Sequence, residues 1–277
     1  MIYRTLNNGI QIPMLGFGTF KASGEECEAS VLAAIRAGYR LIDTAEAYNN
    51  EEYVGNAIAK SSVPREELFI TTKVNFRSYE NARAIVEQSL AKLQVEYLDL
   101  VLLHWPFGNY YAGWHQLEEL YEEGKIRAIG VSNFNPDRLI DLLSFNKVVP
   151  VINQIETHLY CQRKNEHVWE DKYGVAHQAY APLGQGKANK MFEEEAVQQL
   201  AVKYGKTPAQ ILLRFLVQSD VVVIPKSVHE ARIQENIDIF DFELTVEEVA
   251  VLAALDQAAP MTGTPEKPEK VERAMTW

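Results

Sequence analysis

Short apolar segments with the composition of β-strands alternate with segments of helical period along most of the chain. The expected strands are residues 14–18, 40–43, 68–73, 98–104, 128–131, 151–155, 175–180 and 221–224. The expected helices are residues 25–37, 51–59, 82–93, 115–123, 136–145, 193–204 and 208–218. Because eight strands in βα alternation are the count of a closed (β/α)8 TIM barrel, this α/β fold is the prediction.

Two segments near the amino terminus refine this prediction. Tyr3–Leu6 and Ile10–Ile12 flank Asn8-Gly9, a turn sequence that favours a β-hairpin, which could close the floor of the barrel. An open doubly wound sheet is the structural alternative, since βα alternation alone does not exclude it. The segment Gly16-Phe17-Gly18-Thr19-Phe20-Lys21 has no third glycine where a doubly wound dinucleotide site needs one, which disfavours that alternative.

Composition and charge limit the classes of function. The chain has 277 residues, of which 47% are hydrophobic and 23% charged, as in one globular domain spanning residues 1–277. The net charge of -11 disfavours nonspecific binding to nucleic acid or to anionic membranes, because both need a positive surface. An anionic ligand therefore needs a local basic pocket.

Cysteine use and the terminal segments bear on compartment and assembly. Cys27 and Cys161 are too few for a disulfide framework, and Met1–Leu6 lacks the apolar core of a signal peptide. No stretch of about 18 apolar residues is present. We expect a cytoplasmic protein, and a monomer because no interface signal stands out. The Pro/Lys/Glu-rich segment Thr264–Arg273 is expected to be extended and mobile.

Four polar residues lie where expected strands end. Asp43, Lys73 and His104 end three successive strands, and Tyr48 follows the first of them closely. The carboxyl ends of barrel strands converge on one mouth, so these side chains are predicted to share a catalytic site. Taken singly, each has a structural interpretation: an Asp that caps a helix, a Tyr on the rim or a solvated Lys. The combination favours catalysis.

Four longer motifs stand out along the chain. They are Leu15-Gly16-Phe17-Gly18-Thr19, Leu41-Ile42-Asp43-Thr44-Ala45-Glu46-Ala47-Tyr48-Asn49-Asn50-Glu51, Gly130-Val131-Ser132-Asn133-Phe134 and Ile224-Pro225-Lys226-Ser227. These motifs resemble those of the NADPH-dependent aldo-keto reductases, and the resemblance runs from the hairpin to about Asp256. It is closest to the microbial branch that reduces small dicarbonyls, keto sugars and aldehydes, which includes 2,5-diketo-D-gluconate, glyoxal and methylglyoxal reductases.

This resemblance implies a role for each member of the quartet. Tyr48 would donate a proton to the carbonyl oxygen as hydride reaches the carbonyl carbon. Lys73 would lower the pKa of that phenol, Asp43 would hold Lys73, and His104 would orient the carbonyl. The implied reaction is the NADPH-dependent reduction of an aldehyde or ketone to an alcohol.

The resemblance also implies the residues that bind cofactor and substrate. The NADPH or NADP+ site would comprise Ser132, Asn133, Gln154, Tyr180, Pro182, Leu183, Gly184, Gln185, Ile224, Pro225, Lys226, Ser227, Arg232, Glu235 and Asn236. Lys226, Ser227 and Arg232 would bind the 2′-phosphate, and Tyr180 would stack on the nicotinamide. The substrate pocket would be lined by Phe20, Asn49, His104, Trp105 and Phe107.

Three other functions fit parts of this sequence. A Schiff-base lyase could use a lysine at a strand end, although a carboxylate beside Lys73 would keep it protonated. A cofactor-sensing or structural protein could retain the barrel without turnover. A metal hydrolase is disfavoured, because the six histidines show no close His-Glu-His spacing, and no metal is expected.

Overall fold

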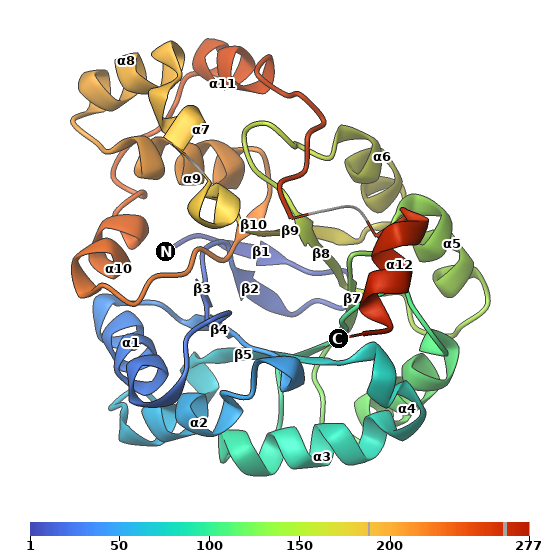
Figure 1. Cartoon of the computed structure of the whole chain (residues 1–277). Coiled ribbons are helices and arrows are strands. Elements are labelled where there is room, and N and C mark those ends of the chain that lie inside the picture. The colour runs from blue at the N-terminus through green and yellow to red at the C-terminus, as the bar shows by residue number, and fades with distance from the viewer. Residues whose placement is uncertain (188, 263–264, 277) are drawn as a thin grey trace.

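Eight parallel strands form the central sheet of the molecule (Figure 1). The structure is a computed structural model, and it describes residues 1–187, 189–262 and 265–276. In chain order the strands are β3 (Phe17–Gly18), β4 (Leu41–Asp43), β5 (Phe69–Val74), β6 (Leu100–Leu103), β7 (Ile129–Ser132), β8 (Ile152–Glu156), β9 (Ala176–Tyr180) and β10 (Val222–Val223). Each strand pairs with the next, and a parallel bridge between Leu15 and Val223 joins the first to the last. The predicted closed barrel is confirmed.

Most of the helices surround this sheet as an outer layer (Figure 1). The helices in the described part of the chain are α1 (Gly24–Ala37), α2 (Glu51–Lys60), α3 (Ala82–Leu93), α4 (Tyr110–Glu122), α5 (Pro136–Ser144), α6 (Lys164–Tyr173), α7 (Asn189–Glu193), α8 (Glu195–Tyr204), α9 (Pro208–Gln218), α10 (Glu230–Ile237), α11 (Val246–Ala253) and α12 (Pro268–Ala274). Short 3₁₀ turns are η1 (Glu46–Tyr48), η2 (Arg65–Glu67), η3 (Phe76–Asn81) and η4 (Gly184–Gly186).

The first helix illustrates how the sequence pattern builds this layer. Cys27, Val31 and Ala34 recur at helical spacing and are all fully buried against the sheet. The helix ends at Gly38, whose φ of 104° lies in the left-handed region, and its backbone N–H bonds the carbonyls of the last turn. The predicted bounds of α3 and α9 agree with the structure residue for residue.

The amino-terminal hairpin lies against the end of the barrel where the strands begin. It consists of β1 (Tyr3–Thr5) and β2 (Gln11–Pro13), paired antiparallel. In its turn, the amide of Asn7 donates to the Pro150 carbonyl, just before β8, and the amide of Asn8 donates to the Arg127 carbonyl, just before β7. The hairpin prediction is confirmed. The polar residues at the carboxyl ends of the strands lie at the opposite end of the barrel.

The structure corrects the expectation for the carboxyl-terminal segment. Residues 268–274 form α12, with Pro268 in the first turn, where a missing N–H costs no helical hydrogen bond. The extended conformation expected from Thr264 to Arg273 is therefore wrong for this part, while Thr264 itself lies outside the described residues. Within the described part of the chain, every helix is too short or too polar to cross a lipid bilayer.

Candidate active site at the barrel mouth

Adjacent strands bring the four predicted catalytic residues to the same end of the barrel. Asp43 is the last residue of β4, Lys73 is the fifth residue of β5, and His104 directly follows β6. Tyr48 ends the turn η1, which follows β4. Because β4, β5 and β6 are parallel neighbours, their carboxyl ends deliver these side chains to one place.

Asp43 and Lys73 form a buried ion pair. Lys73 Nζ donates to Asp43 Oδ1 at 2.5 Å and to the Thr44 carbonyl at 2.9 Å, and Gln154 donates to Asp43 Oδ2 at 2.7 Å. Burial raises the pKa of Asp43 and lowers the pKa of Lys73, while their mutual attraction opposes both shifts. The bonds from Gln154 and to the Thr44 carbonyl also favour the charged forms of the two groups.

The phenol of Tyr48 lies beside this pair. Its ring centroid is 5.1 Å from Lys73 Nζ and 5.8 Å from the His104 ring. Burial, followed by the negative charge of Asp43, holds the pKa of Tyr48 well above its usual value. The predicted lowering of this pKa by Lys73 is therefore wrong for the protein alone, because burial dominates and the negative charge of Asp43 adds to it. The phenol keeps its proton at neutral pH.

His104 is neutral at neutral pH. Burial, with the positive charge of Lys73 as a second cause, lowers the pKa of the imidazole well below its usual value. Its Nδ1 atom is buried and has no hydrogen-bond partner among the residues that the structure describes. A buried polar atom without a partner is costly in a folded protein, so this atom is suited to a ligand.

Aromatic rings extend from the quartet along one side of the mouth. Phe20 lies 5.0 Å from the Tyr48 ring, and Trp105 stacks on His104 at 6.0 Å. Phe107 stacks on Trp105 at 5.5 Å and is itself buried. The structure therefore brings four of the predicted pocket residues together; Asn49, the fifth, is exposed in the left-handed conformation directly after Tyr48.

Sequence reasoning did not identify Phe76 as a neighbour of this aromatic cluster. Its ring packs edge-on against Phe107 at 5.7 Å. Phe76 begins the turn η3 after β5, and an aromatic residue in a turn gives no periodic signal that would reveal its position.

Amide and hydroxyl side chains from β7, β8 and β9 surround the other side of the quartet. Ser132 Oγ donates to the Gln154 carbonyl at 2.8 Å, and Asn133 Nδ2 donates to the His104 carbonyl at 3.1 Å. Tyr180, the last residue of β9, donates to Asn133 Oδ1 at 2.8 Å. The contact between Gln154 and Asp43 was not foreseen, because it joins side chains that are 111 positions apart.

Two further predicted cofactor segments follow the last strands. Pro182 and Leu183 lie between β9 and η4, and Gly184 and Gln185 are the first two residues of η4. Ile224, Pro225, Lys226 and Ser227 come after β10, and the Pro225 carbonyl accepts a hydrogen bond from Gly18 N at 3.1 Å at the barrel seam.

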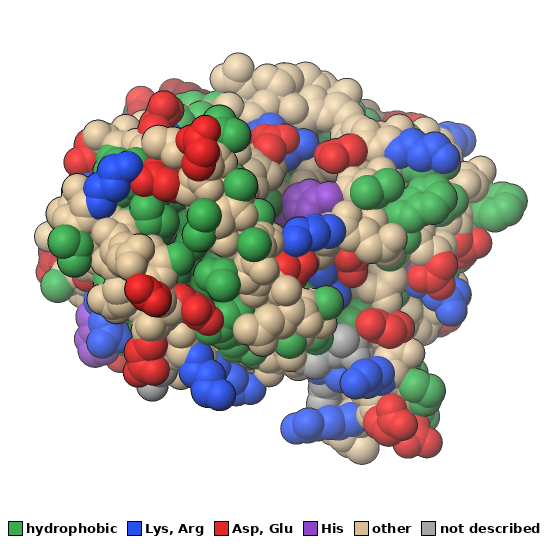
Figure 2. Space-filling view, turned by 90° about the horizontal axis from the view of Figure 1, so that it is seen from above, with side chains coloured by type: hydrophobic (Ala, Val, Ile, Leu, Met, Phe, Trp, Pro, Cys, Tyr) green, Lys and Arg blue, Asp and Glu red, His purple; other side chains and the backbone are tan. Residues whose placement is uncertain are grey.

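The basic residues of the second segment lie at the surface. Lys226 and Arg232 are exposed, and Arg232 is on α10. Asn236 is buried, and Glu235 accepts a hydrogen bond from Thr207 at 2.6 Å, at the start of α9. These exposed cations are notable because acidic side chains outnumber basic ones in the chain, 38 to 27. Figure 2 shows acidic and basic groups interspersed over the face seen from above.

The carboxyl-terminal segment crosses the mouth, which sequence reasoning did not foresee. The buried carboxylate of Glu156, at the end of β8, accepts hydrogen bonds from the backbone N–H groups of Met261 and Thr262. Thr262 Oγ1 lies 3.3 Å from the hydroxyl of Tyr180. In α12, Lys270 Nζ lies 4.9 Å from the ring centroid of Trp105. Pro268 was the one local signal for this helix.

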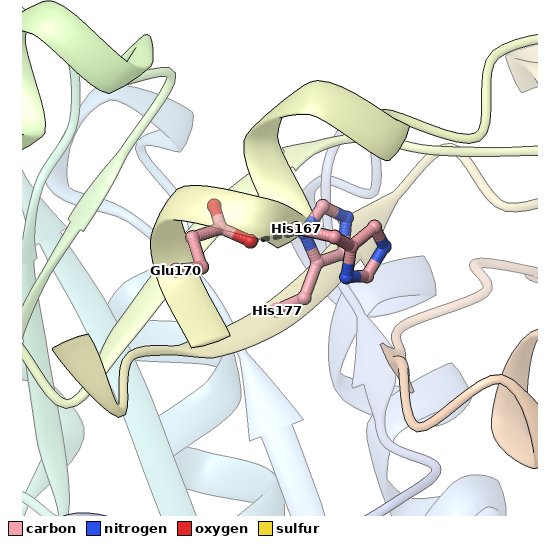
Figure 3. A group of neighbouring side chains, drawn as sticks. All are labelled: His167, Glu170 and His177. Carbon is pink, nitrogen blue, oxygen red and sulfur yellow. Dashed lines mark hydrogen bonds and ion pairs between the residues drawn. The ribbon is translucent and has the colours of Figure 1, made fainter. Parts of the chain in front are cut away.

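A second group of polar side chains lies away from the mouth, in the barrel wall (Figure 3). His167 and Glu170 come from α6 and His177 from β9, and their potential ligand atoms lie within 4.8 Å of one another. The sequence analysis did not anticipate this group, because α6 has almost no apolar stripe and was missed.

Hydrogen bonds within the protein occupy the atoms of Glu170 and His177 that a metal would need. Glu170 Oε2 is 2.6 Å from His177 Nδ1, Asn153 donates to Glu170 Oε1 at 2.7 Å, and Thr157 Oγ1 is 2.7 Å from His177 Nε2. The rings of His167 and His177 are stacked at 3.9 Å, whereas metal ligation needs the ion in each ring plane. The arrangement fits a hydrogen-bond network better than a metal centre.

Comparisons with known proteins agree with this geometry. The model of the aldo/keto reductase family matches residues 14–257. The chain is 43% identical over 265 residues to the methylglyoxal reductase DkgA of Escherichia coli, covering 95% of this chain and 96% of that one. It is 46% identical over 256 residues to the glyoxal reductase of Bacillus subtilis, covering 91% and 92%.

Solved structures give the same picture. An aldo-keto reductase from a deep-sea metagenome library superposes with a TM-score of 0.92 at 39% identity, covering 95% of this chain and 98% of that one. A Bombyx mori aldo-keto reductase in complex with NADP has a TM-score of 0.88 at 35% identity, with 94% of each chain covered.

Proposed function

The chain belongs to the aldo/keto reductase family, and on that premise we propose that it reduces small aldehydes, ketones and dicarbonyls with NADPH, using Tyr48 as proton donor. The glyoxal and methylglyoxal reductases among its relatives support carbonyl reduction. The observation that carries the proposal is the buried Asp43–Lys73 pair beside the Tyr48 phenol. The pair lies at the carboxyl end of the barrel strands, where enzymes of this fold have their active sites.

The hydrogen-bonding and basic side chains at the mouth and at α10 are suited to bind NADPH. Bound NADPH would supply the hydride. Ser132, Asn133 and Gln154 offer amide and hydroxyl groups for its carboxamide, and the ring of Tyr180 offers an aromatic face. The hydrogen bonds that these groups now make within the protein can be exchanged for bonds to a ligand with the same donors and acceptors. The NADP in the Bombyx mori structure supports the same choice.

Tyr48 is suited to protonate the reduced carbonyl oxygen. Its raised pKa keeps the proton on the phenol at neutral pH, and an alkoxide is a stronger base than a phenolate, so transfer to the substrate oxygen is favourable. Once the proton has left, the phenolate is next to the Lys73 ammonium, which Asp43 holds in place.

His104 is suited to hold the carbonyl oxygen during this transfer. A neutral imidazole can donate one hydrogen bond without competing with Tyr48 as an acid. The rings of Trp105 and Phe20 lie beside His104 and Tyr48 and exclude water from the apolar part of a small substrate.

Lys226, Ser227 and Arg232 are proposed to bind the 2′-phosphate, with Glu235 and Asn236 at the adenosine. The exposed cations at the start of α10 fit a dianionic phosphate, since charged hydrogen bonds are stronger than neutral ones. Arg232→Ala should raise KM for NADPH by about tenfold or more and leave KM for NADH nearly unchanged. Arg138→Ala, which removes an exposed arginine from α5, is the matched control. Equal losses for both cofactors would contradict the assignment.

Turnover tests the proposal as a whole. The wild type should oxidise NADPH in the presence of methylglyoxal or phenylglyoxal, as followed by the absorbance of the reduced nicotinamide. Tyr48→Phe should lower kcat by about 10²–10⁴-fold without changing NADPH affinity, because only the hydroxyl is removed. A folded wild type that binds NADPH but reduces no carbonyl would instead favour a sensing role.

The contacts of Lys73 bear on the lyase alternative. A Schiff-base lysine must lose its proton to attack a carbonyl, but Lys73 donates to a carboxylate and to a backbone carbonyl in a fully buried position. Borohydride should therefore trap no covalent adduct.

We also propose that residues 1–277 act as one monomeric domain, which sedimentation and limited proteolysis would test.

A further inference from the structure

The side chain of Gln178 lies inside the barrel, close to the quartet. It is fully buried on β9, in register with Gln154 of β8. Paired residues on neighbouring strands point to the same face of a sheet, and Gln154 contacts Asp43, so both glutamines point into the barrel. The interior of such barrels is filled mainly by branched apolar side chains. A buried glutamine at this place is therefore unusual for the fold.

A chain of hydrogen bonds joins Gln178 to the buried ion pair. Gln154 Nε2 donates to Asp43 Oδ2 at 2.7 Å and to Gln178 Oε1 at 2.8 Å. Asp43 in turn accepts a bond from Lys73 Nζ at 2.5 Å. An amide nitrogen carries two hydrogens, so both hydrogens of the Gln154 amide are used, one for each partner. Only Gln154 stands between Gln178 and the carboxylate that holds Lys73.

This chain fixes the orientation of the Gln178 amide and leaves one of its atoms unpaired. An ionised Asp43 can only accept, so Gln154 must face it with Nε2, and Gln178 must face that nitrogen with its oxygen. Gln178 Nε2 then points elsewhere, and it is buried without a hydrogen-bond partner in the described part of the chain. Because an unpaired buried amide is destabilising, an apolar side chain would fill the same space at lower cost. The acceptor oxygen is what distinguishes Gln178 from such a side chain.

Thr71 is a second polar residue of the same core and provides a comparison. It is fully buried and in register with Asp43, so its side chain also points into the barrel. Its hydroxyl has no hydrogen-bond partner within residues 1–187, 189–262 and 265–276. The side chain of Thr71 therefore has no bond to the quartet, whereas Gln178 is linked to it through Gln154.

We propose that Gln178 is a positioning residue of the active site. By accepting the second hydrogen of the Gln154 amide, it holds that amide against Asp43, and it thereby fixes the ion pair that stabilises the Tyr48 phenolate. The inference rests on the proposed carbonyl reduction and adds a residue to it. Burial raises the pKa of Asp43, and the bond from Gln154 is among the contacts that lower it. Successive hydrogen bonds in a chain strengthen one another, so loss of the acceptor weakens the bond to Asp43.

Replacing the acceptor oxygen tests this inference. Gln178→Met has a similar volume but no such oxygen, and it should lower kcat for methylglyoxal at saturating NADPH by about tenfold. KM for methylglyoxal should stay within about twofold of wild type, because Gln178 is not among the proposed pocket residues. Gln178→Glu restores an oxygen at this place and should recover kcat to within about threefold of wild type.

Thermal unfolding separates this role from a purely structural one. Gln178→Met removes an unpaired amide group and leaves one hydrogen of Gln154 unpaired, so the midpoint should stay within about 3 °C of wild type. Thr71→Val is the matched control, because it removes a buried polar group from the same core at nearly equal volume. It should leave kcat within about twofold of wild type.

The outcomes distinguish the inference from the proposed function. Unchanged kcat in Gln178→Met, an equal loss of kcat in Thr71→Val, or no recovery in Gln178→Glu would overturn the role of Gln178 and leave carbonyl reduction intact. No turnover by a folded wild type would overturn both.

Discussion

Two buried carboxyl groups, Asp43 and Glu170, each bond a basic side chain, yet the two pairs differ in charge and surroundings. Asp43 lies 2.5 Å from Lys73 Nζ at the mouth of the barrel. Glu170 lies 2.6 Å from His177 Nδ1 in the barrel wall, between α6 and β9 (Figure 3). Both carboxyl groups are almost completely buried, so burial alone does not distinguish a catalytic pair from a structural one.

The charge states distinguish them. Burial raises the pKa of Glu170 to about 8 and lowers the pKa of His177 to about 3, so that pair is neutral at neutral pH. The attraction between Asp43 and Lys73 instead opposes the effect of burial on both pKa values, which favours the charged forms of this pair. A charged lysine beside Tyr48 at the mouth can stabilise a phenolate. A neutral pair enclosed between a helix and a strand contributes only packing and hydrogen bonds within the barrel wall.

Replacing Asp43 by its isosteric amide should have the largest effect on stability. Asp43→Asn keeps the shape but leaves the Lys73 ammonium buried without a carboxylate, which should lower the free energy of unfolding by about 3–5 kcal/mol. Urea denaturation monitored by fluorescence would measure it. A loss below about 1 kcal/mol would mean that the mouth pair is neutral, like the wall pair.

Removing one partner from the wall pair should have a smaller effect. Thr157→Val keeps the side-chain volume but removes the hydroxyl that bonds His177 Nε2 at 2.7 Å, which should cost about 1–3 kcal/mol. Turnover should stay at the wild-type level, because the Thr157 hydroxyl bonds the Ile155 carbonyl and His177 and none of the quartet. Loss of kcat at unchanged stability would show that the wall and the mouth are coupled.

The amide replacement in the wall should have the smallest effect, and it should depend on pH. Glu170→Gln mimics the protonated carboxyl and should keep or slightly raise the free energy of unfolding at neutral pH, by on the order of 1 kcal/mol. The same denaturation experiment, repeated across pH, measures the difference from the wild type.

The sign of the pH dependence follows from the raised pKa. The pKa of Glu170 rises from its ordinary value of 4.5 to about 8 in the folded protein. Its contribution to stability is therefore fully present below pH 4.5 and is lost as the pH rises through 8. The wild type should lose stability with rising pH relative to Glu170→Gln. The pKa of His177 lies below its ordinary value of 6.5, so protonation of His177 affects stability only at acidic pH. A parallel pH dependence in both proteins would contradict a neutral Glu170.

The sequence predicted the mouth far better than the wall. Asp43, Lys73 and His104 follow apolar strands whose period is unambiguous, and parallel strands must bring their carboxyl ends together. The pair of Glu170 and His177 could not be predicted, because α6 buries little apolar surface and gives no helical period.

Contacts between residues that are far apart in the chain could not be predicted from the sequence either. The bond from Gln154 to Asp43 and the position of Lys270 on Trp105 depend on how the barrel closes and how the tail returns over it. The direction of the Tyr48 pKa shift was predicted incorrectly, since a linear sequence does not reveal that burial outweighs the neighbouring ammonium.

The two isosteric amide variants, compared for turnover with the same carbonyl substrate and NADPH, give the most direct test of the mouth pair as the catalytic one. Glu170→Gln should retain the wild-type kcat/KM within about twofold, and Asp43→Asn should lose about 10²-fold or more among the molecules that remain folded. Wild-type turnover by folded Asp43→Asn would contradict the account.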